Sequence, residues 1–204
     1  MKAGEVNIYH EDHIQFVFNE DAFYDDFHFS IASNDPSAAH DASPVYHTLP
    51  IDIPVQSYFK VTIKPSKDID LLNLDRLVVK RSYDGKTEIK KAAKEKDGFG
   101  ALFRDFGLFQ LIHDIQPPKI TTHLHDGTRL RAGSSIHFDV VDDLKVIKEF
   151  RVTVDGQWLM FKPSGARYSY EVDEHFPMGE HKLSVLVIDE AGNAVSKDFQ
   201  VTRN

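Results

Sequence analysis

The pattern in this sequence that comes closest to a metal site is His123-Leu124-His125. Residues i and i+2 of a strand point to the same face, so the two imidazoles could share one Zn²⁺. A catalytic zinc needs a third protein ligand and an open position for water, and the following Asp126-Gly127 pair predicts a turn. We favour two solvated histidines at a strand end and keep His123 and His125 as the candidate metal ligands.

Acidic doublets are the next candidates, because paired carboxylates hydrolyse glycosidic bonds. They are Asp25-Asp26, Asp142-Asp143 and Asp173-Glu174. Adjacent residues on a strand point to opposite faces, so a doublet does not by itself converge on a substrate. A further alternative is that Asp142, Asp143 and Asp189 share one end of a domain and bind Ca²⁺, which takes oxygen ligands.

Three aromatic residues are the candidate ligand contacts: Trp158, Tyr168 and Tyr170. They could form a stacking platform for a sugar, but a buried tryptophan with alternating tyrosines is more typical of a sandwich core, which we favour. The sequence contains no cysteine, and no acid–base pair, nucleophile or complete metal set is visible. We predict a non-catalytic chain that needs no cofactor.

The charge of the chain limits its partners. The 204 residues carry a formal net charge of −8, which argues against nucleic acid because phosphates are bound by Lys and Arg. Residues 1–59 hold ten acids and one base, whereas residues 60–96 hold eleven bases and six acids. We favour complementation of the two segments within one domain over a basic surface patch.

Membrane and export signals are missing from the sequence. No run of apolar residues approaches the 18 or so that a membrane span needs, and the first residues lack an apolar signal region. By these signs the chain is either cytoplasmic or a piece of a longer protein.

These side chains would be positioned by strands, because apolar residues alternate along most of the sequence. In residues 135–141, for example, Ile136, Phe138 and Val140 face one way. About seven short strands after residue 118, with an Asp155-Gly156 hairpin turn, are the pattern of an immunoglobulin-like sandwich. The predicted strands there span residues 119–124, 135–141, 150–154, 157–161, 168–172, 183–187 and 194–201.

The first half is less regular, but a second β-sandwich fits it best. Residues 34–44 predict a long loop, and residues 88–96 predict a loop or a single helical turn. Pro117 and Pro118 cannot donate to a strand ladder, so we place a domain boundary there. The sequence thus predicts an all-β chain of two β-sandwich domains, residues 1–114 and residues 115–204, the second immunoglobulin-like.

Several segments together resemble a known arrangement. They are Asn19-Glu20-Asp21-Ala22-Phe23-Tyr24-Asp25-Asp26, residues 103–120 with their Asp114-Ile115-Gln116-Pro117-Pro118 segment, Val154-Asp155-Gly156-Gln157-Trp158 and Asp189-Glu190-Ala191-Gly192-Asn193. The chain resembles the non-catalytic C-terminal region of lysostaphin/LytM-type zinc metallopeptidases of Bacteroidetes-like bacteria. These motifs are turns and strand ends, and the Asp-x-x-Pro-Pro entry at residues 114–118 and the Asp-x-x-Gly-Asn turn at residues 189–193 also occur in many bacterial surface immunoglobulin-like domains.

The resemblance implies an exported cell-envelope protein, periplasmic or extracellular, whose peptidase part cuts peptidoglycan cross-bridges. The family's zinc ligands are a His with an Asp four residues later and the second His of a His-x-His. None of the eleven histidines here has that Asp, so no catalytic residue carries over. His123-Leu124-His125 imitates only the second motif.

The sequence therefore predicts a non-catalytic accessory module of an envelope metallopeptidase. Its partner would be peptidoglycan or the peptidase domain of the same parent chain. One alternative is a stand-alone carbohydrate- or wall-binding module, favoured if Trp158 or the tyrosines are exposed on a concave face. Others are an adhesin-like spacer and a metal-dependent hydrolase, which would need a third ligand beside His123 and His125.

Overall fold

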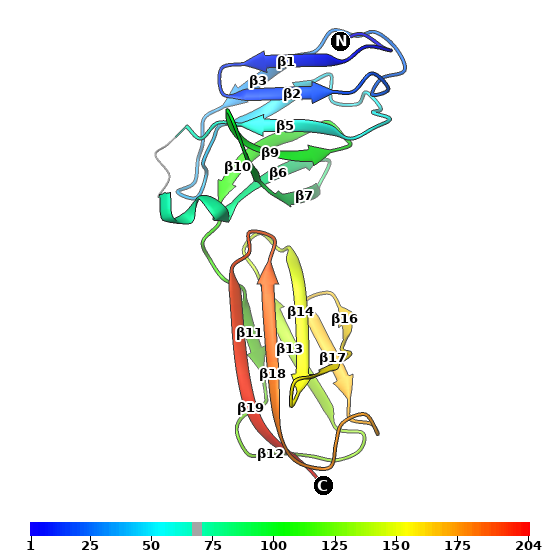
Figure 1. Ribbon diagram of the computed structural model, residues 1–204, viewed down its shortest axis with the longest axis vertical. Helices are drawn as coiled ribbons and strands as arrows, with labels where there is room; N and C mark the ends of the chain where they lie inside the picture. Colours follow the sequence, from blue (N-terminus) through cyan, green and yellow to red (C-terminus); the bar gives the residue numbers. More distant parts are fainter. Residues whose placement is uncertain (67–70) are drawn as a thin grey trace. The chain divides into compact units, whose positions relative to one another are not determined.

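The computed structural model describes residues 1–66 and 71–204 and is nearly all β (Figure 1). The chain divides into two compact units, Met1–Ile115 and Gln116–Asn204. A short 3₁₀ helix, η1 (Leu71–Arg76), precedes strand β6 of unit 1. Among the described residues no helix is long and apolar enough to cross a membrane.

Unit 1 consists of two five-stranded antiparallel sheets. Its first sheet has the order β1 (Asn7–Glu11), β2 (Ile14–Phe18), β5 (Phe59–Ile63), β9 (Gly98–Phe103) and β8 (Ala93–Glu95). Its second sheet has the order β3 (Ser30–Asn34), β4 (Val45–Leu49), β10 (Leu108–His113), β6 (Leu77–Tyr83) and β7 (Lys86–Lys91).

Phenylalanine rings fill the core of unit 1. Alternation along β2 places Phe16 and Phe18 inward, and both side chains are fully buried. Their rings contact Phe59 of β5 and, from the other sheet, Phe109 of β10, at centroid distances between 4.9 and 6.2 Å. These edge-to-face and tilted contacts join the two sheets into one core.

The loop or helical turn predicted for residues 88–96 is wrong. The hairpin partner β7 and the short strand β8 occupy most of this segment, and Ile89 is buried. Its lysines and glutamates lie at solvent-facing positions at the edges of the two sheets, where charged residues are tolerated. The composition of this segment suggested a helical turn. In the structure the segment forms strands because β7 pairs with β6 and β8 pairs with β9.

Unit 2 also contains two sheets, of four and five strands. The first has the order β11 (Lys119–Thr122), β13 (Ser135–Val141), β17 (Arg167–Glu171) and β16 (Lys162–Ser164). The second has the order β12 (Thr128–Leu130), β19 (Ala194–Arg203), β18 (Gly179–Asp189), β14 (Ile147–Val154) and β15 (Gln157–Leu159).

The strand order makes unit 2 an immunoglobulin-like sandwich. The order β11-β13-β17-β16 corresponds to strands A, B, E and D of that fold, and β14-β18-β19 corresponds to C, F and G. Ile136, Phe138 and Val140 of β13 belong to the same hydrophobic core as Val185 and Val187 of β18, and all five are buried. The chain is thus all-β with two sandwich units.

The β14–β15 hairpin has the turn conformation that the Asp155-Gly156 pair predicts. Asp155 has φ 50° and Gly156 has φ 84°, between the paired residues Val154 and Gln157. Positive φ at both central residues defines a type I′ turn, which matches the twist of the flanking strands.

We expect Gly156→Val to destabilise unit 2 by roughly 1–3 kcal/mol, because a β-branched residue is strained at positive φ. Gly156→Asn should retain most of the stability, since Asn tolerates this region. Calorimetric unfolding of both variants measures the effect. An unfolding temperature of the valine variant equal to that of the wild type would contradict the strained-turn argument.

The same turn is attached to β18 through an ion pair. His181 Nδ1 lies 2.6 Å from Asp155 Oδ2, and His181 Nε2 lies 3.0 Å from the Met178 carbonyl oxygen. Acceptors at both ring nitrogens favour the imidazolium, so the hydrogen bond with Asp155 and the Met178 carbonyl raise the pKa of His181. Asp155 accepts hydrogen bonds from His181 and from the Lys182 backbone amide, and both lower its pKa.

This pair predicts a pH-dependent stability. The His181 contribution is complete below its unfolded pKa near 6.5 and is lost as pH rises through the raised folded pKa. The Asp155 contribution is present above its unfolded pKa of 3.8 and is lost as pH falls through the lowered folded pKa. Asp155→Asn should therefore cost more stability at about pH 5.5 than at about pH 9 in urea unfolding. Equal losses at both pH values would show that the pair does not titrate as the geometry implies.

Candidate functional site

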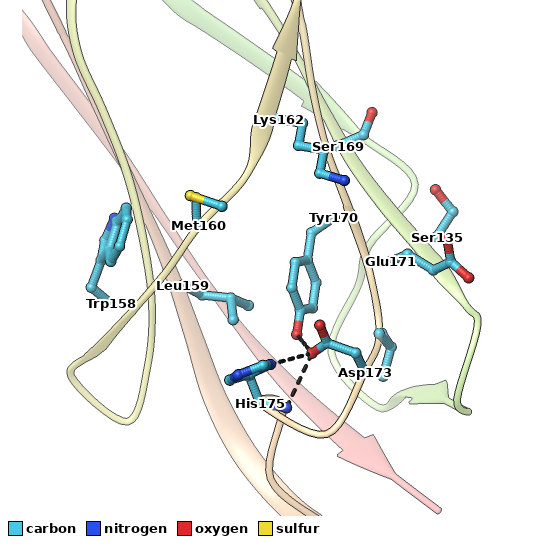
Figure 2. A pocket seen from close by; sticks show the side chains of 11 residues that line it. Ser135, Trp158, Leu159, Met160, Lys162, Ser169, Tyr170, Glu171, Asp173 and His175 are labelled. Atoms are coloured by element: carbon cyan, nitrogen blue, oxygen red, sulfur yellow. Dashed lines mark hydrogen bonds and ion pairs between the residues drawn. The ribbon is translucent and has the colours of Figure 1, made fainter.

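A cavity of 770 Å³ in unit 2 opens beside Trp158 (Figure 2). We call it the Trp158 cavity. Its lining residues are Ser135, Trp158, Leu159, Met160, Lys162, Ser169, Tyr170, Glu171, Val172, Asp173 and His175. In Figure 2, Trp158 and Met160 lie on one side and Tyr170 with Glu171 on the other.

One wall of the cavity is the segment in which the chain leaves one sheet for the other. β15 pairs with β14 in the five-stranded sheet, and β16 pairs with β17 in the four-stranded sheet. Phe161, between them, is 8% exposed and contacts Phe138 and Tyr170 at ring-centroid distances of 5.5 Å. This packing fixes the crossing segment against the core.

Alternation along this segment turns Trp158 outward. Its neighbour Leu159 is buried, whereas the Trp158 side chain is 65% exposed and that of Met160 is 60% exposed. Our expectation of a buried tryptophan is therefore wrong. β15 is an edge strand, so no further strand of its sheet lies beside its outer edge.

The opposite wall is organised by Tyr170. Its ring is 9% exposed, and its hydroxyl donates a hydrogen bond to Asp173 Oδ1. Burial, together with the neighbouring Asp173 carboxylate, raises the pKa of Tyr170 to about 12. The same hydrogen bond lowers the pKa of Asp173, so this carboxylate stays ionised.

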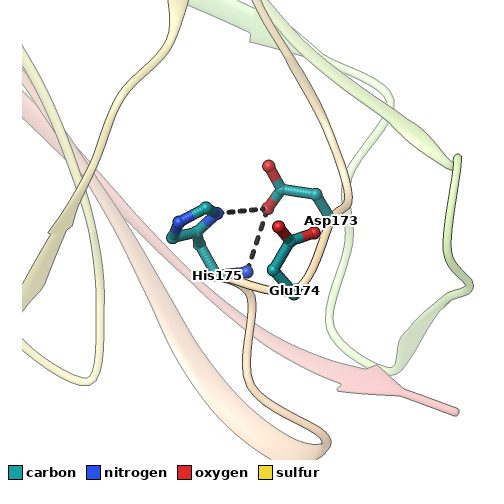
Figure 3. Close-up of side chains that lie close together, drawn as sticks. All are labelled: Asp173, Glu174 and His175. Carbon is teal, nitrogen blue, oxygen red and sulfur yellow. Dashed lines mark hydrogen bonds and ion pairs between the residues drawn. The ribbon is translucent and has the colours of Figure 1, made fainter.

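His175 completes a small polar cluster at the mouth of the cavity (Figure 3). Its backbone amide donates to Asp173 Oδ1 at 3.0 Å, and its Nδ1 lies 3.3 Å from the same oxygen. One ligand atom each of Asp173, Glu174 and His175 lies within 4.8 Å of the others. Adjacent residues point to opposite faces only within a strand, and Asp173 and Glu174 follow β17, so both carboxylates can approach His175.

The three aromatic residues considered as a possible sugar platform are divided between two cavities. Trp158 and Tyr170 line the same cavity, but Tyr168 stacks on Phe150 at a centroid distance of 3.8 Å and lines a second cavity of 430 Å³. Sequence reasoning missed Met160, Asp173 and His175 as cavity residues. The only sequence feature that pointed to this part of the cavity was the acidic doublet Asp173-Glu174.

The His-x-His pair has a neighbour that the sequence did not reveal. The rings of His123 and His137 lie 4.6 Å apart by centroid, and burial with the two neighbouring histidines lowers the pKa of His123. His125 Nδ1 instead lies 2.9 Å from the Asp126 carbonyl oxygen. Among the described residues, the clusters whose ligand atoms lie within 4.8 Å of one another include neither His123 nor His125.

We expect this chain to bind Zn²⁺ no more tightly than about micromolar, because its histidines do not converge as three ligands on one point. It should also leave peptidoglycan cross-bridge peptides intact. Calorimetric titration of Zn²⁺ into metal-free protein, with a peptide-cleavage assay, measures both. Stoichiometric tighter binding with cleavage, both lost in His123→Ala/His125→Ala, would make these histidines catalytic ligands.

Comparison with known proteins gives one family match and several remote structural likenesses. The chain is 17% identical to an endo-β-1,4-mannanase of Thermotoga petrophila, over 45% of this chain and 20% of that chain, with a TM-score of 0.38. It is 13% identical to fibronectin(III)-like modules of Clostridium thermocellum CbhA, over 72% of this chain and 85% of that chain, with a TM-score of 0.35.

A third likeness is to the Bacteroides ovatus mixed-linkage glucan utilization locus protein SGBP-B, solved with a mixed-linkage heptasaccharide. The identity is 10% over 94% of this chain and 41% of that chain, with a TM-score of 0.27. Values this low carry no functional assignment. No curated protein matches the chain. The Zu5-like domain family matches residues 1–114.

Proposed function

This chain belongs to the Zu5-like domain family, and we propose that it works as a non-catalytic binding module. The observation that carries the proposal is the Trp158 cavity, in which an exposed tryptophan faces an ordered set of polar side chains. Ligand sites combine apolar lining with a few placed polar groups, and this cavity has both.

The ligand that fits this lining best is a sugar polymer of the cell wall or another carbohydrate. The exposed ring of Trp158 and the side chain of Met160 offer an apolar surface on which the C–H face of a sugar can pack. Glu171, Lys162 and Ser135 offer hydrogen-bonding groups around that surface. The cavity is open to solvent, so an internal stretch of a polymer chain could bind in it without threading a chain end.

The electrostatic environment of Asp173 fits ligand binding and does not fit the role of a general acid. A glycosidase needs a carboxylic acid whose pKa is raised, so that it can protonate the leaving oxygen. Asp173 has the opposite environment, because Tyr170 and the His175 amide hold its carboxylate in the ionised form. This carboxylate orders the cavity wall and accepts hydrogen bonds.

A finer proposal is that this module accompanies the catalytic domain of an envelope zinc metallopeptidase, in the periplasm or outside the cell. Its support is the resemblance of turn segments to that family. In this chain Asp155-Gly156 joins β14 to β15, and residues 189–193 join β18 to β19. These residues shape turns, which agrees with an accessory role and with a catalytic centre that lies elsewhere in the parent protein.

Trp158→Ala should weaken retention on the polymer at least about tenfold, since an exposed aromatic at the centre of a contact carries much of the binding free energy. Insoluble peptidoglycan, cellulose and chitin serve as probes in depletion assays. Tyr24→Ala is the matched control, because Tyr24 is 64% exposed but lies in unit 1.

The choice of polymer separates the two forms of the proposal. Retention on peptidoglycan alone supports the peptidase-associated module, whereas retention on cellulose or chitin favours a stand-alone carbohydrate-binding module. Equal retention of wild type and Trp158→Ala would show that the Trp158 cavity is not the binding site. No retention on any polymer would favour a structural spacer.

A further inference from the structure

The Trp158 cavity is charged differently at its two ends (Figure 2). Lys162 lies at one end, and Asp173 and His175 lie at the other. Glu174 follows Asp173 in the loop after β17, so two carboxylates stand at the end away from Lys162. We call Asp173 and Glu174 the acid pair.

The carboxylates of the acid pair come together at the mouth of the cavity (Figure 3). One carboxylate oxygen of Asp173 lies within 4.8 Å of one of Glu174. The Asp173 side chain is 44% exposed and Glu174 is exposed, so a ligand in the cavity can reach both. Two negative charges at this distance repel each other, and a cation placed beside both relieves the repulsion.

The protein uses only one of the two carboxylate oxygens of Asp173. The Tyr170 hydroxyl, the His175 amide and the His175 ring all contact Oδ1. Within the described residues, Oδ2 of Asp173 accepts no hydrogen bond and Glu174 makes no ion pair. The hydrogen bond from Tyr170 is the main cause that lowers the pKa of Asp173. The carboxylate is therefore ionised, and its second oxygen is available to a ligand.

An apolar platform lies in the same cavity as the acid pair. The exposed side chains of Trp158 and Met160 line it, and the Tyr170 ring forms the opposite wall. An indole face accepts the C–H groups of a sugar and also attracts a positive charge. The ligand that uses both features has an apolar ring face and a cationic group.

An ammonium group fits the acid pair better than a metal ion or an anion does. Ca²⁺ takes six to eight oxygen ligands, whereas the acid pair offers Oδ2 of Asp173 and the Glu174 carboxylate on an exposed loop. An anionic sugar would be repelled at this end of the cavity. An ammonium donates three hydrogen bonds, and a charge-assisted bond to a carboxylate is roughly twice as strong as a neutral one.

We propose that the ligand of the Trp158 cavity is an oligomer of an amino sugar whose amino groups are free and positively charged. The C–H face of one unit packs on Trp158, and an ammonium of the same unit or the next one bonds to Asp173 Oδ2 and Glu174. This inference rests on the proposed carbohydrate-binding function and narrows its ligand class. An N-acetylated sugar can pack on Trp158 in the same way, but it gives the acid pair no counter-charge.

Two oligosaccharides of equal length test the proposal, because they differ only in the charged group. They are the β-1,4-linked hexamer of glucosamine and that of N-acetylglucosamine. Each is titrated calorimetrically into the full chain at about pH 6, where a primary amine of ordinary pKa is charged, and in about 0.15 M salt, which screens long-range attraction. The glucosamine hexamer should bind at least about tenfold more tightly than the acetylated one.

Substitutions in the acid pair should remove this preference. Glu174→Gln should reduce the ratio of the two affinities at least about threefold, and Asp173→Asn/Glu174→Gln should bring it close to one. The unfolding temperature of Glu174→Gln should equal that of the wild type, since Glu174 is exposed. Trp158→Ala should weaken the binding of both hexamers. Glu20→Gln is the matched control, because it removes an exposed acid of unit 1 and should keep the preference.

The outcomes separate this inference from the function on which it rests. If both hexamers bind equally well and both lose affinity in Trp158→Ala, the amino-sugar proposal is overturned while carbohydrate binding stands. If neither hexamer binds the wild type, the amino-sugar proposal is overturned, and polymer retention decides the broader function separately. Glucosamine-hexamer binding that is unchanged in Trp158→Ala, or that is displaced by an equal concentration of spermine, would show attraction of a polycation to an acidic chain, which also overturns the proposal.

Discussion

The packing of Phe161 between the two sheets decides how unit 2 presents its surface. The chain must cross from β15 to β16, and Phe161 anchors the crossing against Phe138 and Tyr170. With Leu159 and Phe161 buried, Trp158 and Met160 are left on the outside. A pair of inward-facing residues thus creates the exposed apolar wall of the Trp158 cavity, since successive strand residues alternate between faces.

The two acidic clusters of unit 2 show how similar residues acquire different roles. Asp173 receives hydrogen bonds from Tyr170 and the His175 amide, and its pKa is lowered. Asp142 is buried beside two further acids with one oxygen unpartnered, and its pKa is raised. The first carboxylate is satisfied by the protein and orders a wall, whereas the second lacks a counter-charge.

The turn motifs behind the peptidase resemblance have a structural explanation of their own. Asp155 binds His181 and the Lys182 amide, and Asp189 binds both the amide and the side chain of Asn193. Each acid therefore stabilises the backbone of its own turn or of a neighbouring strand. Motifs of this kind are therefore explained by the sandwich architecture alone.

The sequence by itself determined the strands with clear alternation and the turns that follow them. Alternation predicted β13, Asp155-Gly156 predicted the type I′ turn, and Pro117-Pro118 lies just after the division between the two units in the sequence. Periodicity and turn chemistry are local properties, so single residues carry their signal.

Only the tertiary structure decided which residues meet. β12 pairs in parallel with β19, the last strand of the unit, and β7 and β8 are strands because they pair with β6 and β9. The exposure of Trp158, the separation of Tyr168 from Tyr170 and the unpartnered oxygen of Asp142 all follow from strand order and from the crossing between sheets. These are long-range pairings, and local sequence patterns carry no record of them.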